Sequence, residues 1–148
     1  MTKNVLVPVD GSPLSFDALR HAMATFPDAT MTALHVIDLF EPESGSIQGF
    51  DTSYEPMMGT QSWYDRAEEF SDELLAEVRE IAREHDRDID TETDIGDPGR
   101  IVVAFADEED VDHVVIGAHG WETGSRVLLG SVAELVARRS PVPVTLVR

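Results

Sequence analysis

Short apolar runs alternate with amphipathic segments along this chain of 148 residues. Residues 4–9 and 112–117 are apolar and rich in β-branched side chains, as buried strands are. Between such runs, apolar residues recur at helical spacing, most clearly over residues 61–85. Strands that alternate with helices predict an α/β fold, with a parallel sheet covered by helices on both faces.

The predicted elements follow in the order β-α-β-loop-α-β-α-β-α-β. Because right-handed crossovers permit few windings of such a chain, we expect a single domain over residues 1–148 with an open, doubly wound, five-stranded parallel sheet in the order 3-2-1-4-5. The predicted strands are 4–9, 30–38, 89–95, 112–117 and 142–147. The predicted helices start at Ser12-Pro13, cover 61–85, start at Gly96-Asp97-Pro98 and cover 131–139.

Residues 39–60 show no clear periodicity between the second strand and the long helix. A loop of about 22 residues is uncommon in a compact domain and is often a lid, an interaction segment or a disordered stretch. A lid or partner contact and a plain mobile loop both remain open for this segment.

A glycine-rich segment follows the fourth predicted strand. Gly117-Ala118-His119-Gly120 precedes Gly130-Ser131 by nine residues. Glycine lets the backbone approach a ligand closely, and the first N–H groups of a helix attract anions. The segment therefore favours a phosphate site, as half of a nucleotide site. A structural alternative stays open, in which Ser131 and Glu134 form a capping box and the glycines serve only turns.

The expected winding brings this segment close to the end of the first strand. The loops after strands 1 and 4 diverge to opposite faces, and open α/β sheets bind ligands at such a point. Strand 1 ends in Pro8-Val9-Asp10 and strand 4 ends in Ile116-Gly117. The Asp10 carboxylate then accepts hydrogen bonds from ribose hydroxyls in one interpretation, and braces the turn with Gly11 in the other.

The pattern Gly-x2-Gly-x9-Gly-Ser resembles the ATP-binding signature of the universal stress protein family. The resemblance covers nearly the whole chain apart from about 39–60, and it implies an adenine nucleotide alpha hydrolase-like fold. It further implies an ATP-binding stress-response or regulatory module whose nucleotide state alters binding of an unknown protein partner. The matching segments are 5–12, 34–36, 96–98, 126–134 and 140–147.

The same resemblance implies roles for individual residues. Asp10 would contact the nucleoside, and Val36 would offer backbone groups to adenine. His119 is a candidate phosphate contact, against the alternative of a solvent-facing loop histidine. The residues implied to cradle ribose and phosphates, largely through backbone N–H groups, are Gly117, Gly120, Gly130, Ser131 and Val132.

Three residues depart from the family pattern. Trp121 and Glu122 stand where a basic residue is common, and Ala133 replaces a second hydroxyl. ADP or AMP therefore competes with ATP as the expected ligand, unless Arg126 or a bridging Mg²⁺ compensates. The alternative function is a dimeric interaction protein of the same fold that has lost ATP binding.

Other catalytic patterns are absent from the sequence. There is no Gly-x4-Gly-Lys-Ser/Thr loop and no Gly-x-Ser-x-Gly elbow. The five histidines lack the pairing of a zinc site. We expect no protein metal site and no catalytic residue, and ATP hydrolysis that is slow at most. An enzyme of the related adenine nucleotide hydrolase fold is a third, weaker option.

Composition bears on partners and location. No run approaches the roughly 18 apolar residues of a membrane helix, no signal-peptide pattern is present, and cysteine is absent, so we expect a cytoplasmic protein. The final segment 142–147 is apolar at a sheet edge, which an isolated chain would leave prone to pairing. Universal stress proteins pair through this strand, so the resemblance implies a homodimer.

The charge balance is strongly acidic. Asp and Glu number 29 against 11 Lys and Arg, a formal net charge of −18. This balance argues against nucleic-acid binding, which requires basic surface. It suggests adaptation to a salt-rich, halophilic cytoplasm, because molar salt shortens the Debye length to about 3 Å and screens self-repulsion.

We therefore predict that the melting temperature rises when the protein is moved from low salt to molar KCl. Scanning calorimetry over a KCl series measures this directly. A melting temperature that is unchanged or falls across the series would contradict the interpretation of the acidic surface.

Overall fold

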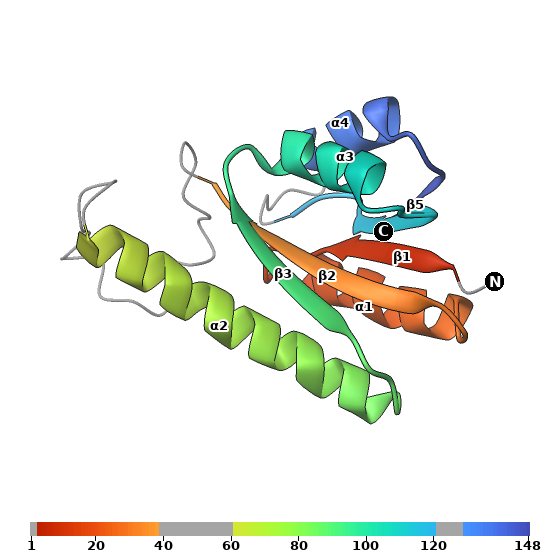
Figure 1. The fold of residues 1–148 in the computed structure, drawn as a ribbon, viewed down its shortest axis with the longest axis horizontal. Coiled ribbons are helices and arrows are strands. Elements are labelled where there is room, and N and C mark those ends of the chain that lie inside the picture. The colour runs from red at the N-terminus through yellow and green to blue at the C-terminus, as the bar shows by residue number, and fades with distance from the viewer. Residues whose placement is uncertain (1–2, 39–60, 121–128) are drawn as a thin grey trace.

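The computed structural model describes residues 3–38, 61–120 and 129–148. The described elements alternate as the sequence predicts, and their ends differ from the predicted ends by only one or two residues (Figure 1). Along the chain they are β1 (Asn4–Pro8), α1 (Pro13–Thr25), β2 (Thr30–Ile37), α2 (Gln61–Glu84), β3 (Asp90–Ile95), α3 (Pro98–Glu108), β4 (His113–Gly117), α4 (Ser131–Arg139) and β5 (Val144–Val147).

The strands form one parallel sheet in the order β3-β2-β1-β4-β5, which confirms the predicted winding. Val5 of β1 pairs with Met31 of β2 on one side and with His113 of β4 on the other. Helices α1 and α2 cover one face of the sheet, and α3 and α4 cover the other (Figure 1). The chain is therefore a doubly wound α/β domain with β1 at its centre.

Two hydrophobic cores result from the alternation of side chains along the central strand. Val5 and Val7 point into the core beneath α1 and α2, where they meet Leu19 and Val78. Leu6 points the opposite way, into the core formed with α3 and α4. All three β1 side chains are at most 1% exposed, so β1 is held from both faces.

Local signals set the helix starts, with one exception. Ser12 caps α1 and Asp97 caps α3 through their side-chain oxygens, and a proline follows each of them, as the sequence predicts. For α4, the capping box of Ser131 and Glu134 that the sequence left open as an alternative does not form. Gly130 occupies the N-cap position and no side chain caps the helix. The Glu134 N–H, which a capping box would direct to the Ser131 side chain, donates instead to the Gly130 carbonyl at 2.9 Å. Ser131 therefore lies inside the first turn.

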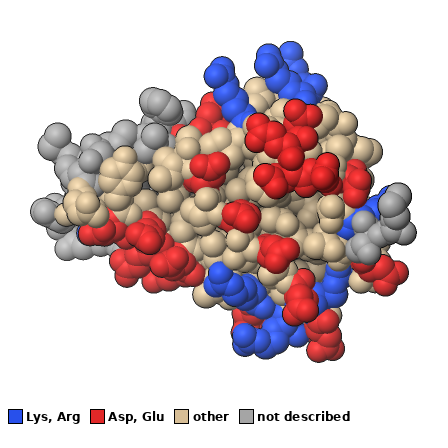
Figure 2. Space-filling view, viewed as in Figure 1, with Lys and Arg blue, Asp and Glu red and all other residues tan. Residues whose placement is uncertain are grey.

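Acidic side chains form several separate patches across the face seen in Figure 2, and basic side chains lie mainly toward its margins. In the described part of the chain, Arg20, Arg83 and Arg138 form ion pairs within their own helices. Such exposed pairs contribute little to stability. None of the helices that the structure describes has the length and apolar character needed to cross a membrane.

Arg87 joins elements that are far apart in sequence. Its guanidinium donates hydrogen bonds to the carbonyls of Met23, Phe26 and Ala29, at 2.9, 3.1 and 2.8 Å. These carbonyls lie at the end of α1 and in the turn to β2, where the helix itself offers no N–H partners. A cation is also favourable at a helix C-terminus. Arg87 thus fixes the connection between α1 and the sheet.

We predict that Arg87→Ala lowers the free energy of unfolding by about 2 kcal/mol, because hydrogen bonds to a charged group are lost from half-buried carbonyls. Arg87→Lys should recover only part of the loss, since an ammonium group lacks the planar donor array of a guanidinium. Chemical denaturation at constant salt measures both.

Arg83→Ala is the matched control, because the Arg83 side chain is 76% exposed and its ion pair among the described residues is with Glu80. Its effect should stay within about 0.5 kcal/mol. Equal losses for the two alanine variants would show that the Arg87 contacts add nothing to stability.

Candidate functional site

The chain leaves neighbouring strands β1 and β4 toward opposite faces of the sheet. After β1 it enters α1 on one face, and after β4 it leads to α4 on the other (Figure 1). The carboxyl ends of β1 and β4 are therefore the predicted point of divergence. We call the residues gathered there, Asp10, 117–120 and 130–132, the divergence site.

Asp10 is held by the turn that follows β1. Its Oδ1 atom accepts the Ser12 N–H at 2.8 Å and also the Ser12 hydroxyl. Gly11 between them has a φ of 84°, a left-handed conformation that favours glycine. Asp10 therefore braces the turn, as the structural interpretation of the sequence expected.

Asp10 also meets the glycine segment. A Cβ atom built at Gly120 would overlap Oδ2 of Asp10, so only glycine allows the backbone this close to the carboxylate without a shift. The structure thus brings together Asp10 and Gly120, two residues that sequence reasoning placed side by side by topology alone.

Gly117 serves a different contact. A Cβ atom there would lie 3.2 Å from the Leu14 carbonyl oxygen and 3.3 Å from Leu14 Cγ. The end of β4 therefore packs directly on the first turn of α1. This packing draws the starts of α1 and α4 toward the same edge of the sheet.

The start of α4 is joined to the end of β4 by backbone hydrogen bonds. Ala118 donates to the Val147 carbonyl and accepts from Gly130, both at 2.7 Å. Gly130 is buried, and its own carbonyl accepts the Glu134 N–H at 2.9 Å. The N–H groups of 131–133 precede this first helical bond, so they form the positive end of the helix dipole at the divergence site.

Backbone groups of β2 face the same place. The Leu34 carbonyl accepts the Val9 N–H, while the Ile37 carbonyl accepts the Gly96 N–H on the β3 side, both at 2.9 Å. Because backbone groups alternate in direction along a parallel strand, Val36 faces the β1 side like Leu34. Pairing with β1 ends at Pro8 and Leu34, so the Val36 N–H and carbonyl lie beyond the end of β1.

The remaining predicted site residues divide into three groups. Pro8, Val9 and Ile116 are buried, so at most their backbone groups are available at the site. His119 is half-buried, and its Nδ1 lies 3.3 Å from the Gly120 carbonyl. Arg126 lies outside the described residues, as do 121–122.

Sequence reasoning missed the second role of Ser12. We predicted it as the N-cap of α1, whereas its hydroxyl also donates to Asp10. The spacing Asp10-Gly11-Ser12 was the available signal, because Asp side chains often accept from the backbone N–H two residues on.

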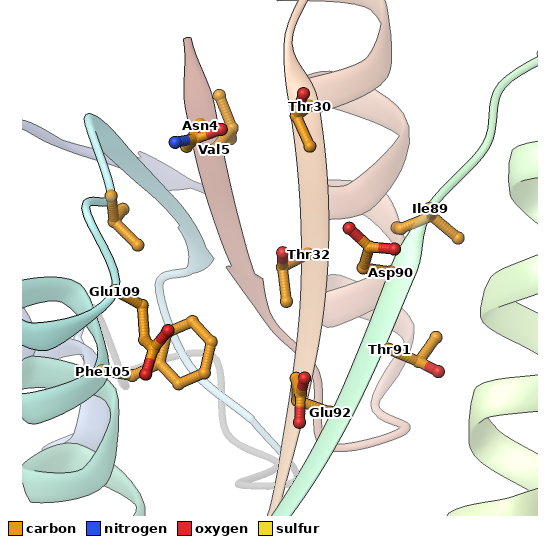
Figure 3. Close-up of a pocket in the computed structure, with 11 residues that line it drawn as sticks. Asn4, Val5, Thr30, Thr32, Ile89, Asp90, Thr91, Glu92, Phe105 and Glu109 are labelled. Carbon is orange, nitrogen blue, oxygen red and sulfur yellow. The ribbon is translucent and has the colours of Figure 1, made fainter.

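A cavity of about 510 Å³ lies at the opposite, amino end of the sheet (Figure 3). Asn4, Thr30 and Asp90, which begin the first three strands, line it together with Glu92 and Glu109. Its described lining residues include three carboxylates and no Lys or Arg. This charge disfavours an anionic ligand there.

His113 lies at the same amino end and is remote from Gly117 at the other end of β4. Its Nε2 is 2.7 Å from the Thr145 hydroxyl, and its ring lies 4.9 Å from that of Phe26. Burial, and secondarily the charge of Lys3, lower the pKa of His113 below 6.5. Because the folded protein disfavours the charged form of His113, protonation of this residue lowers the free energy of unfolding. The loss of stability sets in as the pH falls below 6.5.

A sequence model of the universal stress protein family matches residues 1–148. The chain belongs to this family. A universal stress protein of Methanocaldococcus jannaschii is 31% identical over 151 residues, which cover 99% of this chain and 82% of the relative. The family model covers our chain from residue 1 to residue 148, so the divergence site lies within the part that belongs to the family.

Solved structures agree with the family and the fold. A universal stress protein from Lactobacillus plantarum has a TM-score of 0.68 and 25% identity, covering 99% of this chain and 97% of its own. A universal stress protein in complex with cAMP has a TM-score of 0.69, with the same identity and coverage. The prediction of an adenine nucleotide alpha hydrolase-like fold came from the resemblance of the sequence to this family.

Proposed function

We propose that this universal stress protein binds an adenine nucleotide at the divergence site. The observation that carries the proposal is the close approach of the Asp10 carboxylate to Gly120, where a Cβ atom would overlap Oδ2. A carboxylate held against a side-chain-free backbone, where parallel strands diverge, suits a ribose next to a phosphate. The related structure in complex with cAMP supports an adenine nucleotide as the ligand.

In the proposed complex, different residues bind the adenine, the ribose and the phosphates. The Val36 backbone offers a donor and an acceptor to adenine beyond the end of β1, and Asp10 accepts from ribose hydroxyls. The amides of Gly117 and Gly120 and the first turn of α4 receive the phosphates. The Gly130 N–H is used by the Ala118 carbonyl, so Gly130 takes part as a residue without a side chain at the start of α4. Pro8, Val9, Ile116, Ser131 and Val132 also belong to the proposed set, with His119 beside the phosphates. Arg126, which lies outside the described residues, remains part of it as the candidate basic side chain.

The charge of the ligand is met by backbone dipoles. The described residues of the divergence site include no Lys or Arg, so the α4 N-terminus supplies the favourable potential. We propose that ATP, ADP and AMP all compete for the site, because a longer phosphate chain gains little there without Mg²⁺. Magnesium would reach the site chiefly through the phosphates.

The nucleotide state would regulate contact with a protein partner. The second candidate function is an interaction protein that has lost nucleotide binding. The observation that favours it is the full engagement of Asp10 Oδ1 by Ser12, which gives the carboxylate a structural use. Mass spectrometry of nucleotide carried by the purified protein separates the two functions.

Isothermal titration calorimetry with AMP, ADP and ATP, in strong salt and with or without Mg²⁺, tests the proposed function. We expect saturable binding of one nucleotide per chain. Mg²⁺ should increase the affinity for ATP more than the affinity for AMP. No measurable binding of any of the three would reject nucleotide binding and leave the interaction protein.

We predict that Gly120→Val weakens nucleotide binding more than tenfold, which is about 1.4 kcal/mol or more. The new side chain would displace Asp10 Oδ2 and occupy space next to the phosphates. Ala137→Val adds comparable bulk to an exposed position of α4 and serves as the control. Calorimetric affinities that match for both variants, at similar melting temperatures, would show that Gly120 is only a turn residue.

We also propose a homodimer formed through the C-terminal strand. β5 is an edge strand, and its Leu146 side chain is 38% exposed. A second copy would cover this edge and the flanking residues 142–147. Sedimentation at micromolar concentration and high salt should give the mass of two chains, and Leu146→Arg should give one. A single-chain mass for the unaltered protein would rule out the dimer.

A further inference from the structure

The Ser12 side chain is enclosed between Asp10 and the first turn of α1, with 0% of the residue exposed. Its oxygen accepts the Ser15 N–H at 3.3 Å, which is the capping bond of α1. Its hydroxyl donates to Asp10 Oδ1, the same atom that accepts the Ser12 N–H at 2.8 Å. One carboxylate oxygen therefore receives both donors of Ser12.

The direction of these bonds is determined. A serine hydroxyl has a single proton, and the Ser15 N–H already supplies the proton of the capping bond. The Ser12 proton is therefore directed to Asp10. The Ser15 N–H thus donates to the Ser12 hydroxyl, and the Ser12 hydroxyl donates to the Asp10 carboxylate.

This arrangement fixes the rotation of the carboxylate. The last torsion of an aspartate side chain is broad when nothing restrains it. Here two donors hold Oδ1 toward α1, so Oδ2 is turned toward Gly120. Removal of the Ser12 hydroxyl would take away one of the two hydrogen bonds through which Ser12 holds Oδ1, and so loosen this orientation.

We propose that Ser12 is a positioning residue of the nucleotide site, which presents Asp10 Oδ2 to the sugar and so sets a preference for ribose over deoxyribose. The inference rests on the proposed function, because it takes Asp10 to face the sugar. Ser12 does not itself touch the nucleotide. Its effect on binding passes through the orientation of Asp10.

A purely structural role predicts a different result. Loss of a helix cap would weaken α1 and lower the affinity for every nucleotide alike. Loss of orientation removes only the hydrogen bond between Asp10 and a sugar hydroxyl. The decisive quantity is therefore the ratio of dissociation constants for a deoxynucleotide and the matching ribonucleotide.

The experiment measures calorimetric affinities for AMP, 2′-deoxy-AMP and 3′-deoxy-AMP in strong salt. The unaltered protein should bind AMP about tenfold more tightly than at least one deoxy form. Ser12→Ala should weaken the binding of AMP about tenfold and leave the affinity for that deoxy form nearly unchanged. The ratio of the two dissociation constants then comes close to one. Ser12→Thr keeps both the cap and the hydroxyl and should restore the ratio.

Ser15→Ala is the matched control within the same turn. The Ser15 hydroxyl donates to the Ser12 carbonyl at 2.8 Å, whereas the capping bond uses the Ser15 backbone N–H. This variant perturbs the start of α1 without touching the donors to Asp10, so its ratio should match that of the unaltered protein. Melting temperatures establish that each variant is folded.

Three outcomes would overturn the inference. Equal weakening of all three nucleotides in Ser12→Ala would reduce Ser12 to a helix cap. An unaltered protein that binds AMP and both deoxy forms equally would reject the positioning role while the proposed function stands. An unaltered protein that binds no nucleotide would remove the proposed function and this inference together.

Discussion

The burial of β1 on both faces is the constraint on which the other elements depend. Its side chains alternate between two cores, and its edges pair with β2 and β4. A strand held in this way cannot shift by one residue without moving its apolar side chains to the wrong core. The point where β1 ends is therefore fixed, and so is the position of Asp10 directly after it. The divergence site inherits its geometry from the centre of the fold.

The structure places backbone groups where an anion is expected to bind, in a molecule with a formal net charge of −18. Repulsion between the acidic surface and a phosphate acts at long range, and salt screens it. Helix dipoles act within about one turn of the helix end and are effective at contact distance. The two effects are compatible because they operate over different distances. An acidic surface therefore does not exclude a phosphate site made of amides.

Features with local causes were predictable from the sequence. Strand order followed from the alternation of elements, and the starts of α1 and α3 followed from Ser12 and Asp97 with their prolines. Contacts between distant segments were not predictable. Arg87 binds carbonyls about 60 residues away, and nothing around Arg87 signals it. Ser131 does not cap α4, because the Glu134 N–H bonds to the Gly130 carbonyl. Gly130 is itself bonded to Ala118, a tertiary contact that a capping pattern does not contain. Residues 39–60, Arg126 and its neighbours lie outside the described residues, so the predictions made for them stay predictions.

A crystal structure of the protein soaked with AMP in strong salt would show whether the divergence site holds the nucleotide. We expect a ribose hydroxyl within hydrogen-bond distance of Asp10 Oδ2, adenine against the Val36 backbone, and the phosphate on the amides of Gly120 and Ser131. Solvent alone at the divergence site, in crystals that contain saturating AMP, would contradict it. A nucleotide bound elsewhere, such as the cavity at the amino end of the sheet, would contradict it equally.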